Sequence, residues 1–269
     1  MTNLHMGSEN VSIKRSLSML GWAFNEEENI GEYIERAEKF LRQAVDDFEL
    51  IIIDDGSTDH TWEIASDYQK TRPWLRLYRN DRNRGSGYNT KLAISLAQKD
   101  YLFWQTVDWS YDITVLGESF HLLDTYDVLQ GVRLQTISPQ GMLWSRSDNP
   151  IKAIISVVNY TLIRFLFGLP LRDYQNVTVY PTRLIQSVPL ESESAFTNPE
   201  CLLKTWWKGA TIKEIPVPFI RRSKGVAKGT RIKYVISSIE DVIYWWFRWV
   251  VVGKRKDKKE GKVISYDQS

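Results

Sequence analysis

Acidic and amide side chains follow several apolar segments of this chain, each at the point where a strand is predicted to end. Carboxylates in such positions can accept hydrogen bonds from nucleobase and ribose groups, and they can also bind a divalent cation. If the strands are parallel, these groups meet at one edge of a sheet, where open α/β folds bind ligands. The groups are Asn25-Glu26, Asp54-Asp55, the segment 80–87 and Asp108.

A glycine-containing loop precedes one of the predicted helices. Gly85 and Gly87 lie in the stretch 82–97, which reads RNRGSGYNTKLAISLA. Glycines before a helix allow the backbone to approach a phosphate or ribose closely. As a bare glycine pattern this signal is weak, and it gains meaning only beside the acidic groups.

The elements that must position these groups alternate between strands and helices, which predicts an α/β fold with a parallel sheet and crossover helices. Short apolar runs that end in turns are typical of buried strands, and longer amphipathic segments are typical of helices. The predicted strands are 17–24, 49–54, 74–80, 101–107 and 126–133, and the predicted helices are 26–45, 58–70 and 87–98.

The second half of the chain has a different character. Residues 151–171 and 231–253 are long, aromatic-rich and interrupted by charges, and a basic segment, 254–262, follows the second. Such segments are typical of amphipathic helices that lie on a membrane surface, although a core helix or a subunit interface has the same pattern. No apolar run reaches the roughly 18 residues of a membrane span.

Size and composition set broad limits. The chain has 269 residues, enough for one large domain, and a formal net charge of +2. That charge is too small to indicate nucleic-acid binding, and no nucleic-acid-binding motif accompanies the short basic segment. The single cysteine, Cys201, excludes an internal disulfide framework and fits a reducing compartment. Residues 1–16 are polar, without the apolar core of a signal peptide, and we expect them to be flexible.

In order and spacing, these motifs resemble the family 2 glycosyltransferases, and most closely the polyprenyl- and dolichol-phosphate sugar synthase branch. The resemblance extends from about Leu17 to Lys228. The matching features are Asn25-Glu26, the run from Asp54 to Thr61, Asn83 to Gly87, an acidic motif at Asp108, Gly131-x-Arg133, Asp173, Pro199-Glu200, the run 208–219 and Arg222-x-x-Gly225-x-x-Lys228.

The resemblance implies a GT-A fold, which is a Rossmann-like, mixed but mostly parallel sheet flanked by helices, with amphipathic interfacial helices at its C-terminal end. It also implies a flexible segment 1–16, a catalytic domain 17–230, a membrane-surface or interface helix 231–253 and a basic tail 254–269. The implied reaction moves a sugar from a nucleoside-diphosphate sugar to a polyprenyl phosphate with inversion, on the cytoplasmic face of a membrane. A homo-oligomer is a further expectation.

The same resemblance implies roles for individual residues. The residues that would bind the nucleotide sugar are Phe24, Asn25, Glu26, Asp54, Asp55, Gly85 and Gly87. Asp108 would serve the metal and the diphosphate in catalysis, and the phosphates of acceptor and leaving group would be neutralised by Arg133, Arg222 and Lys228. The implied metal is Mg²⁺ or Mn²⁺, with Asp108 and Asp112 as its ligands.

One departure from the family pattern concerns the metal. Family members usually carry Asp-x-Asp, whereas this chain has Thr106-Val107-Asp108. Threonine is a poor Mg²⁺ ligand, but magnesium often uses only one or two carboxylates together with phosphate oxygens. Three interpretations follow: an active enzyme with weakened metal binding, a metal-independent enzyme, or a sugar-nucleotide-binding partner that has lost catalysis.

A second departure lies in the stretch 172–185, where Gln175-Asn176 replace smaller residues of the branch. This leaves open a soluble family 2 enzyme that glycosylates a saccharide or protein. Such an acceptor has a neutral hydroxyl and needs a general base, for which Asp112 and Asp173 are the candidates.

Overall fold

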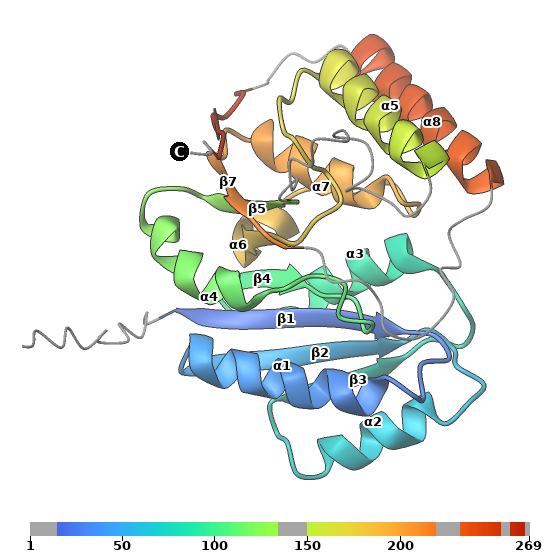
Figure 1. Ribbon diagram of the computed structural model, residues 1–269, viewed down its shortest axis with the longest axis vertical. Coiled ribbons are helices and arrows are strands. Elements are labelled where there is room, and N and C mark those ends of the chain that lie inside the picture. The colour runs from blue at the N-terminus through green and yellow to red at the C-terminus, as the bar shows by residue number, and fades with distance from the viewer. Residues whose placement is uncertain (1–14, 134–149, 219–231, 254–258, 267–269) are drawn as a thin grey trace, which may run out of the picture.

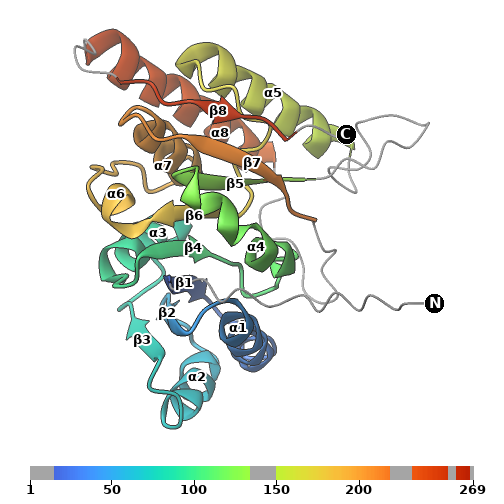
Figure 2. The same cartoon turned by 90° about the vertical axis from the view of Figure 1, so that its left-hand side faces the viewer.

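The computed structural model describes residues 15–133, 150–218, 232–253 and 259–266. One eight-stranded sheet runs through the molecule in the order β3-β2-β1-β4-β6-β5-β7-β8, and Figure 2 shows the strands stacked in this order. The strands are β1 (Ser16–Ala23), β2 (Asp47–Asp54), β3 (Leu75–Arg79), β4 (Tyr101–Trp104), β5 (Val128–Val132), β6 (Thr178–Pro181), β7 (Ile212–Pro216) and β8 (Val263–Ile264).

The sheet is mixed but mostly parallel. β1 pairs in parallel with β2 and β4, and β2 pairs in parallel with β3. β6 is antiparallel to both of its neighbours, β4 and β5, while β5, β7 and β8 are again parallel. The predicted α/β fold is therefore confirmed, and the carboxyl ends of β1, β2 and β4 lie at one edge as expected.

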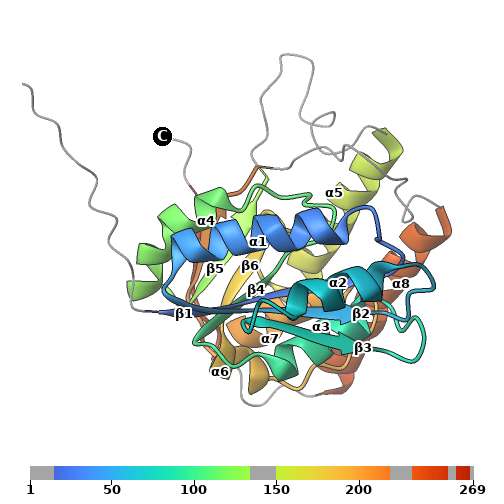
Figure 3. The ribbon, with the colours of Figure 1, turned by 90° about the horizontal axis from the view of Figure 1, so that it is seen from below.

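Helices cover both faces of the sheet (Figure 3). α1, α2 and α4 pack on one face, and α3, α6 and α7 on the other, each over a buried apolar cluster. The helices are α1 (Ile30–Ala44), α2 (Thr61–Gln69), α3 (Ser86–Leu96), α4 (Thr114–Ser119), α5 (Pro150–Phe167), α6 (Thr182–Gln186), α7 (Thr197–Trp206) and α8 (Ile232–Trp246), with the 3-10 turn η1 (Phe120–Asp124) and the π-helical turn η2 (Phe247–Val252).

Two elements at the site edge are shorter than the sequence predicted. The first helix begins at Ile30 rather than Glu26, because Asn25 has a positive φ of 54° and the backbone carbonyl of Glu26 accepts from Asn29 N in a turn. The fourth strand ends at Trp104 rather than at residue 107, where a turn around Asp108 replaces sheet pairing. Both differences place polar residues in turns at the carboxyl edge of the sheet.

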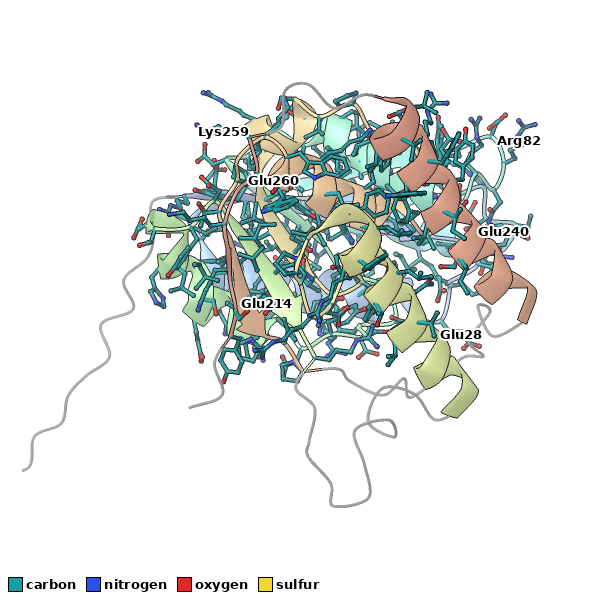
Figure 4. The ribbon with its side chains drawn as sticks, turned by 90° about the horizontal axis from the view of Figure 1, so that it is seen from above. Glu28, Arg82, Glu214, Glu240, Lys259 and Glu260 are labelled. Carbon is teal, nitrogen blue, oxygen red and sulfur yellow. The ribbon has the colours of Figure 1, made fainter. Side chains whose placement is uncertain are left out.

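α5 and α8 lie side by side at one end of the molecule (Figure 1). Asn159 Nδ2 of α5 donates to Ser238 Oγ of α8 at 2.5 Å. Phe167 and Trp249 turn inward to the apolar cluster beneath, while Phe165 is 85% exposed. Figure 4 shows the two helices from above, with Glu240 on α8. Within the described residues, no helix is long and apolar enough to cross a membrane.

The C-terminal segment adds a strand where the sequence predicted only a basic tail. β8 pairs in parallel with β7, through Ile212 opposite Val263. Gly261 anchors this segment, because its N–H donates to the carbonyl of Trp206 and its own carbonyl accepts from the Trp206 indole, both at 2.9 Å. The basic composition of this segment did not indicate a strand, although its backbone pairs with β7 and forms the last strand of the sheet.

Candidate active site

The loops that follow β1 and β2 are tied to each other by side-chain hydrogen bonds. Asn25 Oδ1 accepts from Thr58 N at 2.9 Å, and Asn25 N donates to Ser57 Oγ at 3.0 Å. Glu26 N donates to Thr61 Oγ1 at 2.8 Å. Phe24 directly precedes this turn. The structure thus brings the turn of Asn25 and Glu26 against the loop that follows Asp54 and Asp55.

The two adjacent aspartates at the end of this region have different partners. Asp54 Oδ2 pairs with Arg79 Nε at 2.9 Å, and its Oδ1 accepts from Ser57 N. Asp55 accepts from Arg84 N and Asn80 Nδ2 at 2.8 Å each, and from Gly85 N at 3.0 Å. Both carboxylates are almost fully buried. Asp55 therefore holds the glycine loop in place, which is a structural task that the sequence did not reveal.

The two glycines of that loop serve different needs. Gly85 has φ +83°, which favours glycine, and the space around its missing side chain is open. A Cβ at Gly87 would lie 2.2 Å from the backbone carbonyl carbon of Glu193. Gly87 thus allows the start of α3 to pack against the segment before α7, whereas close approach to a phosphate remains a prediction.

Replacement of Gly87 by alanine is expected to destabilise the fold. The methyl group would collide with backbone that cannot move alone, and overpacking of this kind costs about 1–3 kcal/mol. Gly117→Ala, within α4, is the comparison, because its Cβ would meet no atom within 4 Å and its φ is not positive, so alanine should cost nothing there. Urea unfolding measures both; equal losses would contradict the packing role of Gly87.

Asp108 lies in a tight turn at the carboxyl end of β4. Its Oδ1 accepts from Thr106 Oγ1 and Ser110 Oγ at 2.6 Å each, and from Ser110 N at 3.2 Å. Trp109, which lies between Asp108 and Ser110 in the chain, has a positive φ of 53° and is buried. Thr106 therefore has a hydroxyl where the family pattern has a carboxylate, and this hydroxyl orients the carboxylate of Asp108.

Asp112, the second predicted metal ligand, lies at the start of α4. Its Oδ1 accepts from Thr114 N at 3.2 Å and from Thr114 Oγ1 at 2.6 Å. This is the pattern of a carboxylate that stabilises a helix N-terminus. In the described part of the chain, no three His, Cys, Asp or Glu side chains form a cluster that would hold a metal by themselves.

Arg133 and Asp173 form a buried ion pair next to this region. Arg133 Nε lies 3.1 Å from Asp173 Oδ2, and Asp173 Oδ1 accepts from Tyr160 Oη at 3.0 Å. Burial by itself lowers the pKa of the Arg133 guanidinium, but the Asp173 carboxylate outweighs it and the pKa is raised. Burial raises the pKa of Tyr160, with Asp173 adding to the rise. Arg133 thus stays charged while it is partly neutralised.

Arg222 and Lys228 lie outside the described residues, so their predicted roles remain predictions. The structure also brings together residues that the sequence either indicated only as departures from the family pattern or did not indicate. A cavity of about 260 Å³ opens between the start of α3, the end of β4 and the start of α7. Trp22, Trp104, Thr106, Tyr111, Gln175 and Asn176 are among its lining residues. Thr106, Gln175 and Asn176 were named from the sequence, whereas Trp22, Trp104 and Tyr111 were not, because these residues lie far apart in the chain and no local motif connects them.

The mixed sheet, with acidic turns at the carboxyl ends of β1, β2 and β4, defines an α/β fold of the GT-A class. Residues 22–180 match the family model "Glycosyl transferase family 2". The chain belongs to this glycosyltransferase family, as the sequence resemblance implied.

Two named relatives agree with this membership. Glycosyltransferase AglD of Haloferax volcanii is 25% identical over 239 residues, which are 85% of this chain and 36% of AglD. The dolichyl-phosphate beta-glucosyltransferase of Dictyostelium discoideum is 31% identical over 99 residues, which are 34% of this chain and 30% of that protein. The chain thus spans about a third of the length of these relatives.

The mannosyltransferase PcManGT from Pyrobaculum calidifontis, solved with GDP-Man and Mn2+, superposes with a TM-score of 0.59 at 13% identity. The alignment covers 90% of this chain and 70% of that one. At this identity the likeness concerns the fold alone, and it confirms the predicted GT-A architecture.

Proposed function

We propose that this protein transfers a sugar, with inversion, from a nucleoside-diphosphate sugar to a polyprenyl phosphate at a membrane surface. The observation that carries the choice of acceptor is that both candidate general bases are engaged elsewhere. Asp173 is 2% exposed and paired with Arg133 and Tyr160, and Asp112 Oδ1 accepts from both the N–H and the hydroxyl of Thr114. A lipid phosphate is already anionic at neutral pH, so it needs no strong base.

The same site offers charge where the leaving group needs it. The developing charge on a departing diphosphate is stabilised by a cation and by preorganised donors. We assign the nucleoside to the turns of Asn25-Glu26 and Asp54, and the phosphates to the region of Asp108 and Arg133. In this proposal Arg222 and Lys228 supply further positive charge.

The oxygen atoms of Asp108 suit a divalent cation whose other ligands come from the substrate. One oxygen of Asp108 is already saturated by Thr106 and Ser110, so this chain contributes few oxygen ligands. Mg²⁺ tolerates this when phosphate oxygens and water complete its shell. We propose that Asp108 holds Mg²⁺ or Mn²⁺ jointly with the diphosphate, with Asp112 as the second predicted ligand. The cation would supply Lewis-acid stabilisation of the leaving group.

Metal binding is therefore expected to depend on nucleotide. Calorimetric titration of Mn²⁺ into the protein alone should give no measurable heat, because Asp108 and Asp112 leave most of the coordination shell to the diphosphate and water. The same titration after saturation with the nucleoside diphosphate should show one site, once the heat of Mn²⁺ binding to the free nucleotide is subtracted. Tight Mn²⁺ binding without nucleotide would contradict the shared site.

Attachment to a membrane surface is supported by an exposed apolar face on α5, α8 and η2. Isolated exposed apolar residues are ordinary, but a cluster on adjacent helices indicates an interaction surface. The exposed residues of this face are Val157, Val158, Phe165, Ile243, Tyr244, Phe247, Val251 and Val252. The named dolichyl-phosphate relative agrees with a lipid acceptor, and we place the site on the cytoplasmic face. A homo-oligomer that covers the same face is the competing prediction.

A charge on this face is expected to weaken vesicle binding. Phe165→Asp removes an 85% exposed ring and should lower co-sedimentation with anionic vesicles about tenfold, because a buried aromatic side chain contributes roughly 1.5–3 kcal/mol. Gln43→Asp, on the exposed surface of α1, adds the same charge elsewhere and should have little effect. Equal vesicle binding by both variants would contradict the assignment.

A further inference from the structure

We propose that Glu191 is a positioning residue that connects the turn η2 to the glycine loop, so that membrane binding tightens nucleotide-sugar binding. Glu191 lies in the α6–α7 loop, residues 187–196. This inference rests on the proposed function, because it assumes both the membrane face, which is the exposed apolar face of α5, α8 and η2, and the nucleotide site. It adds a way in which the membrane regulates that site.

The carboxylate of Glu191 fixes η2 to the α6–α7 loop. Its Oε2 accepts from Arg248 Nε at 3.1 Å and lies 3.0 Å from Arg248 Nη2. Its Oε1 accepts from Trp249 Nε1 at 2.8 Å. Arg248 and Trp249 are adjacent in η2, so both oxygens of one carboxylate are bonded to this turn. Charge-assisted hydrogen bonds are stronger than neutral ones, and several to one group also fix its orientation.

The same carboxylate is held from the other side by α7. Lys204 Nζ donates to Glu191 Oε1 at 2.8 Å and lies 2.6 Å from Glu200 Oε1. Glu200 is fully buried and accepts from the backbone N–H groups of Glu191 and Ser192. Burial by itself raises the pKa of the Glu191 carboxyl, but the hydrogen bond from Lys204 outweighs it and the pKa is lowered. Glu191 therefore stays ionised at neutral pH.

The α6–α7 loop continues from Glu191 to the start of α3. The backbone of Glu193 occupies the space where Gly87 has no side chain. Lys91 Nζ of α3 lies 2.6 Å from Glu193 Oε1. Ser194 lines the cavity between α3, β4 and α7. The glycine loop and the start of α3 therefore pack against a loop whose other end is bonded to η2.

η2 has one side in the protein and one side on the membrane face. Trp249 is buried and its ring lies 6.2 Å from that of Phe167 in α5, whereas Phe247, Val251 and Val252 are exposed. These three side chains continue the apolar face of α5 and α8 only while η2 keeps this position. A membrane that binds the whole face therefore favours the docked position of η2, and such a difference in affinity is what shifts a conformational equilibrium.

Binding at the two ends of this connection is therefore expected to be coupled. The membrane holds η2, η2 holds the α6–α7 loop through Glu191, and the loop supports the start of α3. Linkage is reciprocal, so a bound nucleotide sugar must tighten membrane binding by the same factor. A purely structural role of Glu191 would instead change nucleotide-sugar affinity equally with and without a membrane.

The test measures affinities for UDP-glucose and GDP-mannose by calorimetry, with and without saturating vesicles of phosphatidylcholine and phosphatidylglycerol. The vesicles contain no polyprenyl phosphate, so acceptor binding does not contribute. In wild type, vesicles should tighten binding of the matching nucleotide sugar by about fivefold or more, which is the lower end of typical coupling. In Glu191→Gln this gain should be lost. Co-sedimentation of the variant with vesicles should persist, because the exposed apolar side chains are unchanged.

Glu240→Gln is the matched control. Glu240 is exposed on α8 (Figure 4), so this variant removes the same charge from an element of the membrane face and should keep the full gain. Arg248→Gln is a second test variant, because it breaks the ion pair with Glu191 from an exposed position and leaves Lys204 in place. It should also reduce the gain. If Glu191→Gln does not fold, Arg248→Gln alone decides.

A full gain in Glu191→Gln would refute the role of Glu191. If wild type binds both nucleotide sugar and vesicles but the two affinities are independent, the coupling is refuted and the proposed function stands. If wild type binds no nucleotide sugar or no vesicles, the proposed function itself fails, and the coupling fails with it.

Discussion

Asp108→Asn should reduce the transfer rate about a thousand-fold, because a catalytic cation contributes several kcal/mol to the transition state and each 1.36 kcal/mol is tenfold. The asparagine Oδ1 can still accept from Thr106 and Ser110, as Asp108 does now. The turn should therefore persist, and the loss reports on charge and metal binding alone. Steady-state rates with saturating nucleotide sugar measure the effect.

Asp112→Asn is the informative comparison for that experiment. Asparagine caps helices about as well as aspartate, so the bonds to Thr114 can remain. If Asp112 acts only as a cap, the rate should fall less than about threefold. A loss as large as that of Asp108→Asn would make Asp112 the second metal ligand that the sequence predicted. Full activity of Asp108→Asn would contradict the central role of Asp108.

Thr106→Asp should increase the affinity for Mn²⁺ by at least about tenfold, because it restores a second carboxylate beside Asp108. The same change removes the 2.6 Å hydrogen bond from Thr106 Oγ1 and places like charges in contact. Without metal, the variant should lose about 1–3 kcal/mol of stability, since Asp108 loses a donor and gains a repulsive neighbour. Thermal unfolding with and without Mn²⁺ measures both effects.

Turnover in the same variant separates an active enzyme from a binding partner that has lost catalysis. If the chain is an enzyme adapted to threonine, the rate at saturating Mn²⁺ should change little. A large gain from an almost inactive wild type would favour a decayed site instead. Thr106→Val is the control, because it removes the hydroxyl without adding charge and should raise no metal affinity.

The sheet and its first helices could be predicted from the sequence because strand and helix periodicity in the first 133 residues is strong. Strand ends were less predictable. The positive φ values of Asn25 and Trp109 are set by turns whose bonds come from residues such as Ser57 and Ser110. β8 was missed because its pairing depends on Trp206 and Gly261 meeting in space.

The predicted site residues around Asn25, Asp54 and Asp108 do lie at one edge of the sheet, since the parallel strands β1, β2 and β4 bring their carboxyl ends together. Their individual tasks could not be read from the chain. Asp55 is adjacent to Asp54 but binds the glycine loop, and Gly87 faces Glu193. Such assignments depend on long-range packing, which a motif does not encode.

The measurement that tests the central claim most directly is transfer of labelled sugar to a lipid phosphate in vesicles. The protein, Mn²⁺, labelled UDP-glucose or GDP-mannose, and undecaprenyl phosphate are incubated together, and the lipid fraction is analysed. The account predicts an acid-labile glycosyl phospholipid with inverted anomeric configuration, whose formation is lost in Asp108→Asn. Label that stays out of the lipid fraction, while a soluble saccharide is glycosylated, would contradict it.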